Sequence, residues 1–223
     1  MKVVIGLGGS IVAPEKPDLD FIKDFSEFII KLHNEGHKIM VVVGGGKAAK
    51  DYIKIARQLG ANEDFCDELG IRFTRANAML LTSAMREYAL DHIPEGFDEA
   101  TETDKIYVMG GTVPGHTTDA VATMLARHTK ADLLIIATNV DGVYDKDPNT
   151  SPDARRFERI SSEELLDLVS SPNYSAGATT IVDPKAAGII HEEGIKTIVL
   201  LGKDTENMEN AISGRDYRGT LVY

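Results

Sequence analysis

The sequence predicts an α/β sandwich with a central, mainly parallel sheet, and two observations carry this prediction. Five short apolar segments are continuous rather than alternating, which is typical of strands that are covered on both faces. Helical patterns lie between these segments, so strand and helix alternate along most of the chain. The predicted strands span residues 3–5, 39–43, 106–109, 133–137 and 197–201.

The helices are predicted from apolar residues that recur at intervals of three and four. Four such residues share one helix face within residues 21–32, and Gly36 follows as a helix-terminating residue. Similar spacing predicts apolar helix faces over residues 53–59, before Gly60, and over residues 121–125. The apolar face of residues 21–32 suits either the core of the domain or an interface between subunits.

The chain is predicted to form a single domain. Its 223 residues are 43% hydrophobic and 26% charged, which excludes a disordered or low-complexity chain. No linker rich in Pro, Gly and Ser divides it. Residues 139–159 are polar, contain Pro148 and Pro152, and are long for a simple connection. We expect a functional loop or a small hairpin there.

Charge, cysteine content and hydropathy exclude several classes of protein. The formal net charge is −11, and no Lys/Arg run exceeds Arg155-Arg156, so a nucleic-acid polymer is not an expected partner. The single Cys66 excludes a disulfide scaffold or a zinc finger. No apolar run approaches the ~20 residues of a membrane span, and no signal-peptide pattern opens the chain. We expect a cytoplasmic protein without a membrane partner.

Three glycine-rich turns each follow a predicted strand, at residues 8–10, 44–46 and 110–112. Glycine lets backbone N–H groups approach an anion, and a following helix adds its positive N-terminal end. The carboxyl ends of parallel strands meet at one edge of a sheet, so three such turns predict a phosphate-binding crevice. Neither a Walker A sequence nor the G-x-G-x-x-G motif of a Rossmann helix is present, so the two commonest nucleotide folds lose support.

Five ordered segments resemble the amino-acid kinase superfamily and, within it, the archaeal-type uridylate (UMP) kinases. The resemblance implies a three-layer sandwich, the amino-acid kinase fold, over residues 1–223, with UMP-side elements mainly in 1–130 and ATP-side elements mainly in 131–223. It also implies transfer of the γ-phosphate of ATP to UMP, with Mg²⁺, in pyrimidine nucleotide biosynthesis, by a homohexamer. The segments are residues 8–10, 43–47, 70–77, 110–119 and 137–148.

The resemblance also places the two nucleotides on particular residues. Asp67 is expected at the UMP sugar, because an ionised carboxylate accepts hydrogen bonds from hydroxyls and repels phosphate. The expected ATP contacts are Gly8, Gly9, Ser10, Gly45, Lys50, Thr138, Asn139, Tyr144 and Asp147. The other expected UMP contacts are Gly44, Thr112, Val113, Pro114, Gly115, His116, Thr117 and Thr118.

Four charged residues are the catalytic candidates, and each also has a structural explanation. Lys50 follows the second glycine turn, where related kinases commonly carry a phosphate-contacting Arg, and is otherwise a solvated surface lysine. Lys47 opens the same helix, where a cation opposes the helix dipole unless an anion lies between them. Asp119 and Asp183 each precede or open a helix, so they suit capping as well as organising the site. No set of residues has the spacing of a protein metal site.

One position departs from the superfamily. Many members carry a lysine two residues before the first Gly-Gly, and this chain has Gly6 there. Lys2 lies ~13 Å away at the rise of a strand and cannot substitute. We hypothesise that Lys47 or Lys185 takes over the role.

Two alternative functions remain open at this point. One is a kinase on the same fold for acetylglutamate, carbamate or isopentenyl phosphate, although isopentenyl-type relatives carry a catalytic His where Val43 stands. The other is a non-catalytic nucleotide-binding protein, which Gly6 favours. The four charged candidates count against it, since a binding protein has less need of them.

Overall fold

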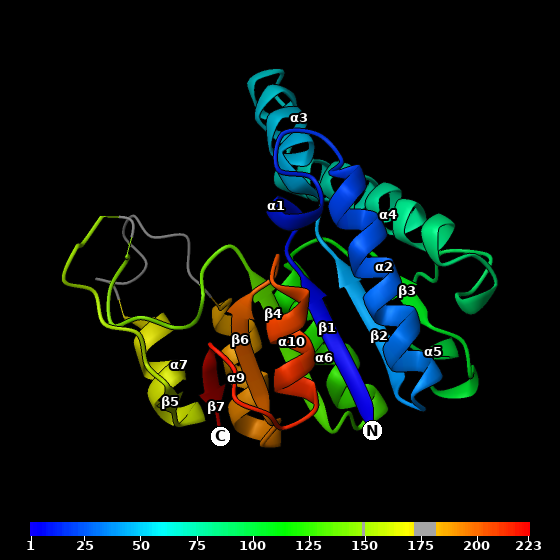
Figure 1. Cartoon of the computed structure of the whole chain (residues 1–223). Coiled ribbons are helices and arrows are strands. Elements are labelled where there is room, and N and C mark those ends of the chain that lie inside the picture. The colour runs from blue at the N-terminus through cyan, green and yellow to red at the C-terminus, as the bar shows by residue number, and fades with distance from the viewer. Residues whose placement is uncertain (149, 172–181) are drawn as a thin grey trace.

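The computed structural model describes residues 1–148, 150–171 and 182–223, which form three layers around one central sheet (Figure 1). The strand order is β3-β2-β1-β4-β6-β7-β5, and every adjacent pair is parallel except β6 with β7. The predicted three-layer sandwich with a mainly parallel sheet is therefore confirmed. The strands are β1 (Lys2–Leu7), β2 (Lys38–Val43), β3 (Tyr107–Met109), β4 (Leu133–Thr138), β5 (Arg159–Ile160), β6 (Thr197–Leu201) and β7 (Thr220–Val222).

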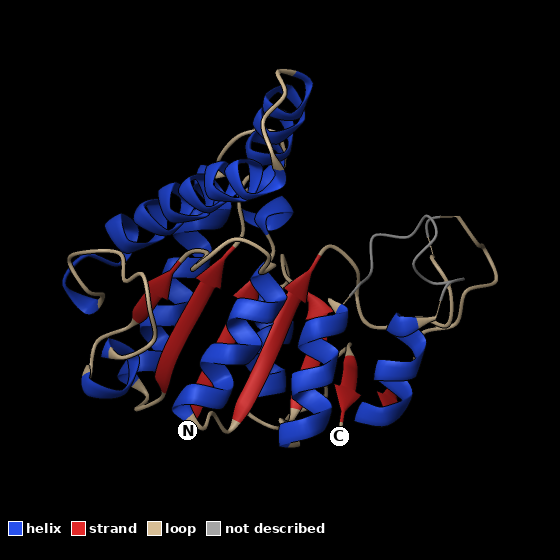
Figure 2. Ribbon diagram, turned by 180° about the vertical axis from the view of Figure 1, so that it is seen from behind, coloured by secondary structure: helices blue, strands red, loops and turns tan. Residues whose placement is uncertain are grey.

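The helices cover both faces of the sheet (Figure 2). Side chains of α2, α4 and α10 join the core on one face, and those of α6, α7 and α9 join the core on the other. The helices are α1 (Gly9–Val12), α2 (Leu19–Asn34), α3 (Gly46–Gln58), α4 (Glu63–Met85), the 3₁₀ turn η1 (Arg86–Tyr88), α5 (Glu99–Glu102), α6 (Thr118–Thr129), α7 (Ser162–Ser170), α9 (Pro184–Glu193) and α10 (Thr205–Ile212).

Strand β1 shows why the apolar segments are continuous. Val3, Ile5 and Leu7 belong to the core on the α2 side, whereas Val4 belongs to the core on the α6 side. Successive strand residues point to opposite faces, and both faces are covered, so the residues from Val3 to Leu7 are all buried and none has a polar side chain. The same arrangement holds for β2 and β4, which flank β1.

The helix ends follow local side-chain rules. Asp18 caps α2 by accepting the Phe21 N–H at 3.2 Å, and Asn62 caps α4 by accepting the Phe65 N–H at 2.9 Å. The apolar face within residues 21–32 is buried in the core, which is the first of its two predicted uses.

The prediction of an apolar helix face over residues 53–59 is wrong at the C-terminal end of that range. Residues 46–58 are helical, but Leu59 is 83% exposed. The reason is that α3 projects beyond the sheet and packs mainly against α4 (Figure 1), so no core covers its far end.

Two features of the C-terminal half complete the fold. The loop after β4 doubles back as the predicted hairpin, because the Phe157 N–H donates to the Val143 carbonyl at 2.9 Å and Tyr144 bridges to Arg156. Strands β5 and β7 lie outside the five predicted ones, since they are two and three residues long. Within the described residues, no helix combines the length and the apolar character that crossing a bilayer requires.

Candidate active site

The three glycine turns meet at one end of the sheet. They follow β1, β2 and β3, which are neighbouring strands, so their carboxyl ends lie side by side. They surround a pocket of about 400 Å³, called the glycine crevice below. It is lined by Gly9, Ser10, Gly44, Gly45, Gly46, Ala49, Lys50, Ile53, Asp67, Gly70, Ile71, Thr74, Gly111, Val113, His116, Thr117 and Thr118.

The first two glycine turns are in backbone-to-backbone contact. A methyl group added to Gly9 would lie 2.1 Å from the Gly46 nitrogen, and one added to Gly44 would lie 2.3 Å from the Gly9 nitrogen. No side chain fits at either position unless the backbone moves. The glycines therefore let two strand ends converge, in addition to any contact with an anion.

The predicted UMP contacts lie together at the crevice. Gly44, Asp67, Val113, His116, Thr117 and Thr118 line it, and Thr112, Pro114 and Gly115 belong to the same β3–α6 loop, residues 110–117. Thr117 caps α6 by accepting the Ala120 N–H at 3.2 Å. One Asp67 oxygen accepts the Gly115 N–H at 2.7 Å and so ties α4 to the loop.

The two lysines after the second glycine turn differ in their surroundings. Lys50 lines the crevice and, within the described residues, makes no ion pair, so its ammonium group is available to an anion. The Lys47 ammonium lies 2.7 Å from Asp51 and 3.5 Å from Glu15 and is absent from the crevice lining. Its two acidic neighbours explain a cation at this helix start without a bound anion.

Carboxylates gather where α6 and α9 begin. Burial raises the pKa of Asp119 to about 7, and the charge of Asp183 adds to the shift. Asp183 also caps α9, accepting the N–H groups of Lys185 at 2.8 Å and Ala186 at 3.1 Å. Burial and the nearby charge of Lys185 lower the pKa of His116, which favours its neutral form. The structure thus brings the two predicted acids together beside the β3–α6 loop.

The packing of α6 explains Gly6. A Cβ atom at this position would lie 3.0 Å from the Ala122 Cβ, so α6 lies directly on β1 and leaves no room for a long side chain. Lys2 is at the opposite end of β1, where its ammonium group donates to the Thr129 carbonyl at 3.1 Å. Lys185 lies nearer the crevice, beside His116.

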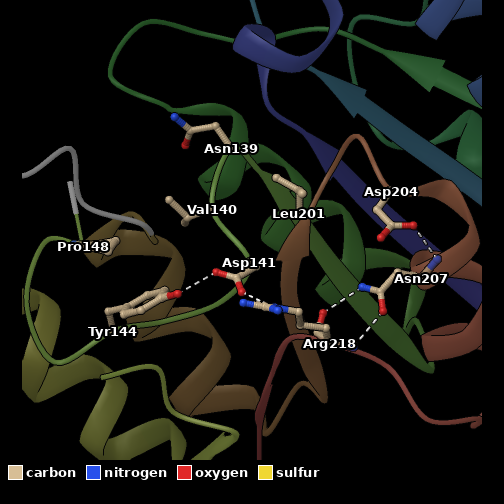
Figure 3. A pocket seen from close by; sticks show the side chains of 9 residues that line it. All are labelled: Asn139, Val140, Asp141, Tyr144, Pro148, Leu201, Asp204, Asn207 and Arg218. Carbon is tan, nitrogen blue, oxygen red and sulfur yellow. Dashed lines mark hydrogen bonds and ion pairs between the residues drawn. The ribbon is translucent and has the colours of Figure 1, made fainter. Parts of the chain in front are cut away.

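A second pocket, of about 520 Å³, lies beyond the ends of β4 and β6 (Figure 3). We call it the Asp141 pocket. Of the predicted ATP contacts, Asn139 and Tyr144 line it, whereas Thr138 and Asp147 are in the chain segments on either side of them. Gly8, Gly9, Ser10 and Gly45 belong to the crevice side. The pocket is lined by Asn139, Val140, Asp141, Tyr144, Pro148, Leu201, Asp204, Asn207 and Arg218.

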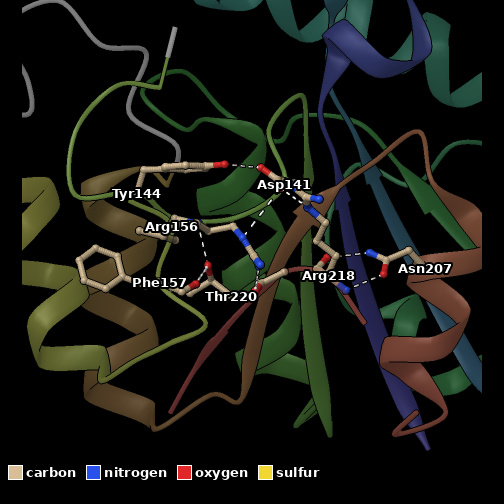
Figure 4. Close-up of polar contacts among 9 residues, drawn as sticks. Asp141, Tyr144, Arg156, Phe157, Asn207, Arg218 and Thr220 are labelled. Carbon is tan, nitrogen blue, oxygen red and sulfur yellow. Dashed lines mark hydrogen bonds and ion pairs between the residues drawn. The ribbon is translucent and has the colours of Figure 1, made fainter. Parts of the chain in front are cut away.

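A chain of polar contacts encloses this pocket (Figure 4). The Asp141 carboxylate accepts the Tyr144 hydroxyl at 2.7 Å and the Arg218 guanidinium, and the guanidinium of Arg156 lies 3.8 Å away. Burial raises the pKa of Asp141, but the hydrogen bonds from Tyr144 and Arg218 outweigh it and hold that pKa below its usual range. Asn207 accepts the Arg218 N–H and donates to the Arg218 carbonyl, both at 2.7 Å, which fixes the backbone behind the guanidinium.

Four lining residues of the Asp141 pocket lie outside every motif found in the sequence. Leu201, Asp204, Asn207 and Arg218 come from the last 23 residues, and they reach the pocket only because β6, α10 and β7 fold back beside β4. Asp141 stood within a motif, but its role as the shared partner of Tyr144 and Arg218 depends on this fold. Neither the composition nor the spacing of neighbouring residues predicts a contact between segments so far apart in the sequence.

The fold and the two pockets define a kinase-type α/β protein, and the chain belongs to the amino acid kinase family, whose model matches residues 1–200. Among its relatives are uridylate kinases of archaea. The uridylate kinase of Methanocaldococcus jannaschii is 47% identical, and that of Pyrococcus abyssi is 48% identical; in both cases the match covers 100% of this chain and 99% of the relative. The crystal structure of the uridylate kinase from Archaeoglobus fulgidus superposes with a TM-score of 0.90 at 45% identity, over the whole of both chains.

Proposed function

We propose that this protein transfers the γ-phosphoryl group of ATP to UMP and releases UDP and ADP. The observation that carries the proposal is the full-length match to proteins named uridylate kinase, combined with two adjacent pockets on the expected fold. The glycine crevice would hold UMP and the donor phosphates, and the Asp141 pocket would hold the rest of ATP. The division into a UMP side, residues 1–130, and an ATP side, residues 131–223, is supported by crevice residues between 9 and 118 and pocket residues between 139 and 218.

The chemistry of the proposed reaction suits these residues. Phosphoryl transfer passes through a loose transition state, so catalysis comes from alignment and from positive charge around the moving group. Backbone N–H groups of the turns and the N-terminal end of α6 supply partial positive charge at the crevice. Lys50 adds a full charge there. Of the two candidates for the role lost at Gly6, we favour Lys185, because Lys47 is paired with Asp51 and Glu15.

Mg²⁺ fits the proposed site as a partner of the donor phosphates. In the described ranges, no group of three or more His, Cys, Asp or Glu residues is arranged to hold a metal by itself. Burial and the nearby charge of Asp183 raise the pKa of Asp119, so a bound cation would offset negative charge there. Two carboxylates plus phosphate oxygens form the oxygen set that Mg²⁺ prefers. When bound, the ion would neutralise charge on the transferring group.

The proposal extends to the setting of the reaction. We place the enzyme in pyrimidine nucleotide synthesis in the cytoplasm, and we propose a homohexamer, on the resemblance to archaeal-type uridylate kinases. Size-exclusion chromatography with light scattering tests the oligomer, and a mass other than six times 24.3 kDa contradicts it.

An assay of ADP release tests the proposed reaction. ATP and Mg²⁺ are combined with UMP, CMP, dUMP, acetylglutamate or isopentenyl phosphate as acceptor, and we expect rapid ADP release with UMP. Absence of UMP-dependent ADP release would falsify the proposal. Release with acetylglutamate or isopentenyl phosphate instead would identify a different kinase on the same fold.

A further inference from the structure

The segment Thr74–Asn77 on α4 belongs to a sequence motif for which the reaction supplies no role. It lies at the wall of the crevice, which Thr74 lines, where α4 passes close to two of the glycine-rich segments. A Cβ atom at Gly110 would lie 2.5 Å from the Thr74 hydroxyl oxygen and 2.7 Å from the Arg75 nitrogen, so the helix and the β3–α6 loop are in direct contact. Three of the four residues in this segment send a side chain to the backbone of the crevice.

Thr74 makes the shortest of these contacts. Its hydroxyl accepts the Gly111 N–H at 2.7 Å and donates to the Ile71 carbonyl of its own helix at 2.6 Å. The hydroxyl donates its only proton and accepts with one lone pair, so the orientation of the Gly111 N–H is fixed. This N–H group is therefore not available to a ligand, and the donors for an anion must come from elsewhere in the crevice.

Arg75 orients the next two peptide groups. Its guanidinium lies 3.4 Å from the carbonyl oxygens of both Gly111 and Thr112, and it is held from the other side by Glu95 at 2.7 Å. In a planar trans peptide the carbonyl and the following N–H point in opposite directions. The N–H groups of Thr112 and Val113 therefore point away from the guanidinium, and the two carbonyls are turned toward it.

Asn77 reaches the second glycine turn. Its side chain is 6% exposed, and its amide nitrogen donates to the Gly44 carbonyl at 2.8 Å. One helix segment thus bonds both to Gly44 and to the β3–α6 loop. Within the described residues, none of these side-chain hydrogen bonds reaches the first glycine turn, residues 8–10.

We propose that Thr74, Arg75 and Asn77 are positioning residues that hold the second glycine turn and the β3–α6 loop in their anion-binding form. Their hydrogen bonds to the crevice go to the backbone of Gly44, Gly111 and Thr112, in the parts assigned to UMP. The inference rests on the proposed function. A ligand that needs oriented N–H groups loses affinity when those groups are free to turn, because it must then order them on binding.

The test compares Thr74→Val, which keeps the shape but removes the hydroxyl, with Thr74→Ser, which keeps the hydroxyl. Ser83→Ala is the matched control, because among the described residues the Ser83 hydroxyl bonds only to the Met79 carbonyl on the same helix, at 2.8 Å. Calorimetry measures the Kd for UMP and the Kd for ATP. We expect Thr74→Val to raise the Kd for UMP about tenfold, with a change below about threefold for ATP, and Thr74→Ser to restore most of the UMP affinity.

Two results overturn the proposal: unchanged UMP affinity in Thr74→Val, or an equal loss of UMP and ATP affinity, which indicates general damage. If circular dichroism shows that Thr74→Val does not fold, Arg75→Gln decides by the same criteria, since the Arg75 side chain is 24% exposed and its ion-pair partner Glu95 is 73% exposed. Failure of the proposed function is seen separately on the unaltered protein. If that protein binds UMP without releasing ADP, the proposed reaction is wrong and the affinity comparison still decides the inference.

Discussion

The glycine crevice and the Asp141 pocket are built in opposite ways. At the crevice, backbone meets backbone, because glycines without Cβ atoms let two strand ends touch. The Asp141 pocket consists of side chains, held by a carboxylate shared between a tyrosine and an arginine. We therefore expect added side-chain volume to damage the crevice most, and an unbalanced charge to damage the Asp141 pocket most.

The largest expected effect comes from adding one methyl group to the crevice. Gly9→Ala places a Cβ atom 2.1 Å from the Gly46 nitrogen, so the two turns must separate. We expect turnover to fall by at least about 100-fold, as misplacement of reacting groups by an ångström does. The matched control is Gly96→Ala, since Gly96 has open space around its Cβ position. Steady-state turnover with ATP and UMP measures both, and equal activity in the two variants would contradict the role given to close turn packing.

The next effect separates the two lysines of α3. Lys50→Ala is expected to lower kcat/KM by about 10- to 100-fold, the value of a hydrogen bond to a charged group. Lys47→Ala is expected to change it less than about threefold, because that ammonium group serves exposed ion pairs. If neither substitution lowers kcat/KM, the crevice is not a phosphate site, which is the result that the net negative charge of the chain favours.

A smaller effect is expected in the Asp141 pocket. Among the described residues that line it, Arg218 is the only cation, and it neutralises Asp141. Arg218→Gln leaves the Asp141 carboxylate without its nearest cation in the pocket assigned to the rest of ATP, and the uncompensated charge repels the negatively charged nucleotide, so we expect the KM for ATP to rise about tenfold while the KM for UMP is unchanged. In the double variant Asp141→Asn/Arg218→Gln, the KM for ATP should return toward the parent value. If it stays high, Arg218 acts on the nucleotide directly rather than through Asp141.

The smallest effect is on stability. The folded-state pKa of Asp119 is raised to about 7 from 3.8, so the folded protein binds the proton more tightly than the unfolded chain. The stability of the ligand-free protein therefore falls as pH rises from about 4 to 7. Asp119→Asn removes this loss and should raise Tm by about 5 °C at pH 8, with no gain at pH 4. Thermal unfolding at the two pH values measures it, and an equal Tm shift at both would show that burial of charge is not the cause.

The sequence predicted the parts of the molecule that depend on neighbouring residues. The five predicted strands, the helix that begins at the second glycine turn and the clustering of three glycine turns all follow from local patterns, and all are present. The contact of Thr74 with Gly111 joins residues 37 positions apart, and that of Arg218 with Asp141 joins residues 77 positions apart. Such contacts depend on strand order, which the pattern of apolar residues does not contain.

The exposed end of α3 illustrates a different reason. Leu59 fits the apolar spacing of its helix, yet it is exposed, because burial depends on whether another element covers the face. Gly6 shows the converse. The sequence pattern indicates a lost catalytic lysine at this position. The structure instead explains the glycine by the close approach of α6 to β1.

Strand β7 has a consequence for the order in which the protein can assemble during synthesis. Within the described residues, β5 pairs with β7 alone, and β7 comes much later in the chain, after β6 and α10. A growing polypeptide can form β1 to β4 early, but β5 has no partner in the sheet until residues 220–222 have left the ribosome. Arg218, shortly before β7, becomes available at the same stage. The half of the molecule that we assign to UMP can therefore be in place before the half that we assign to ATP is closed.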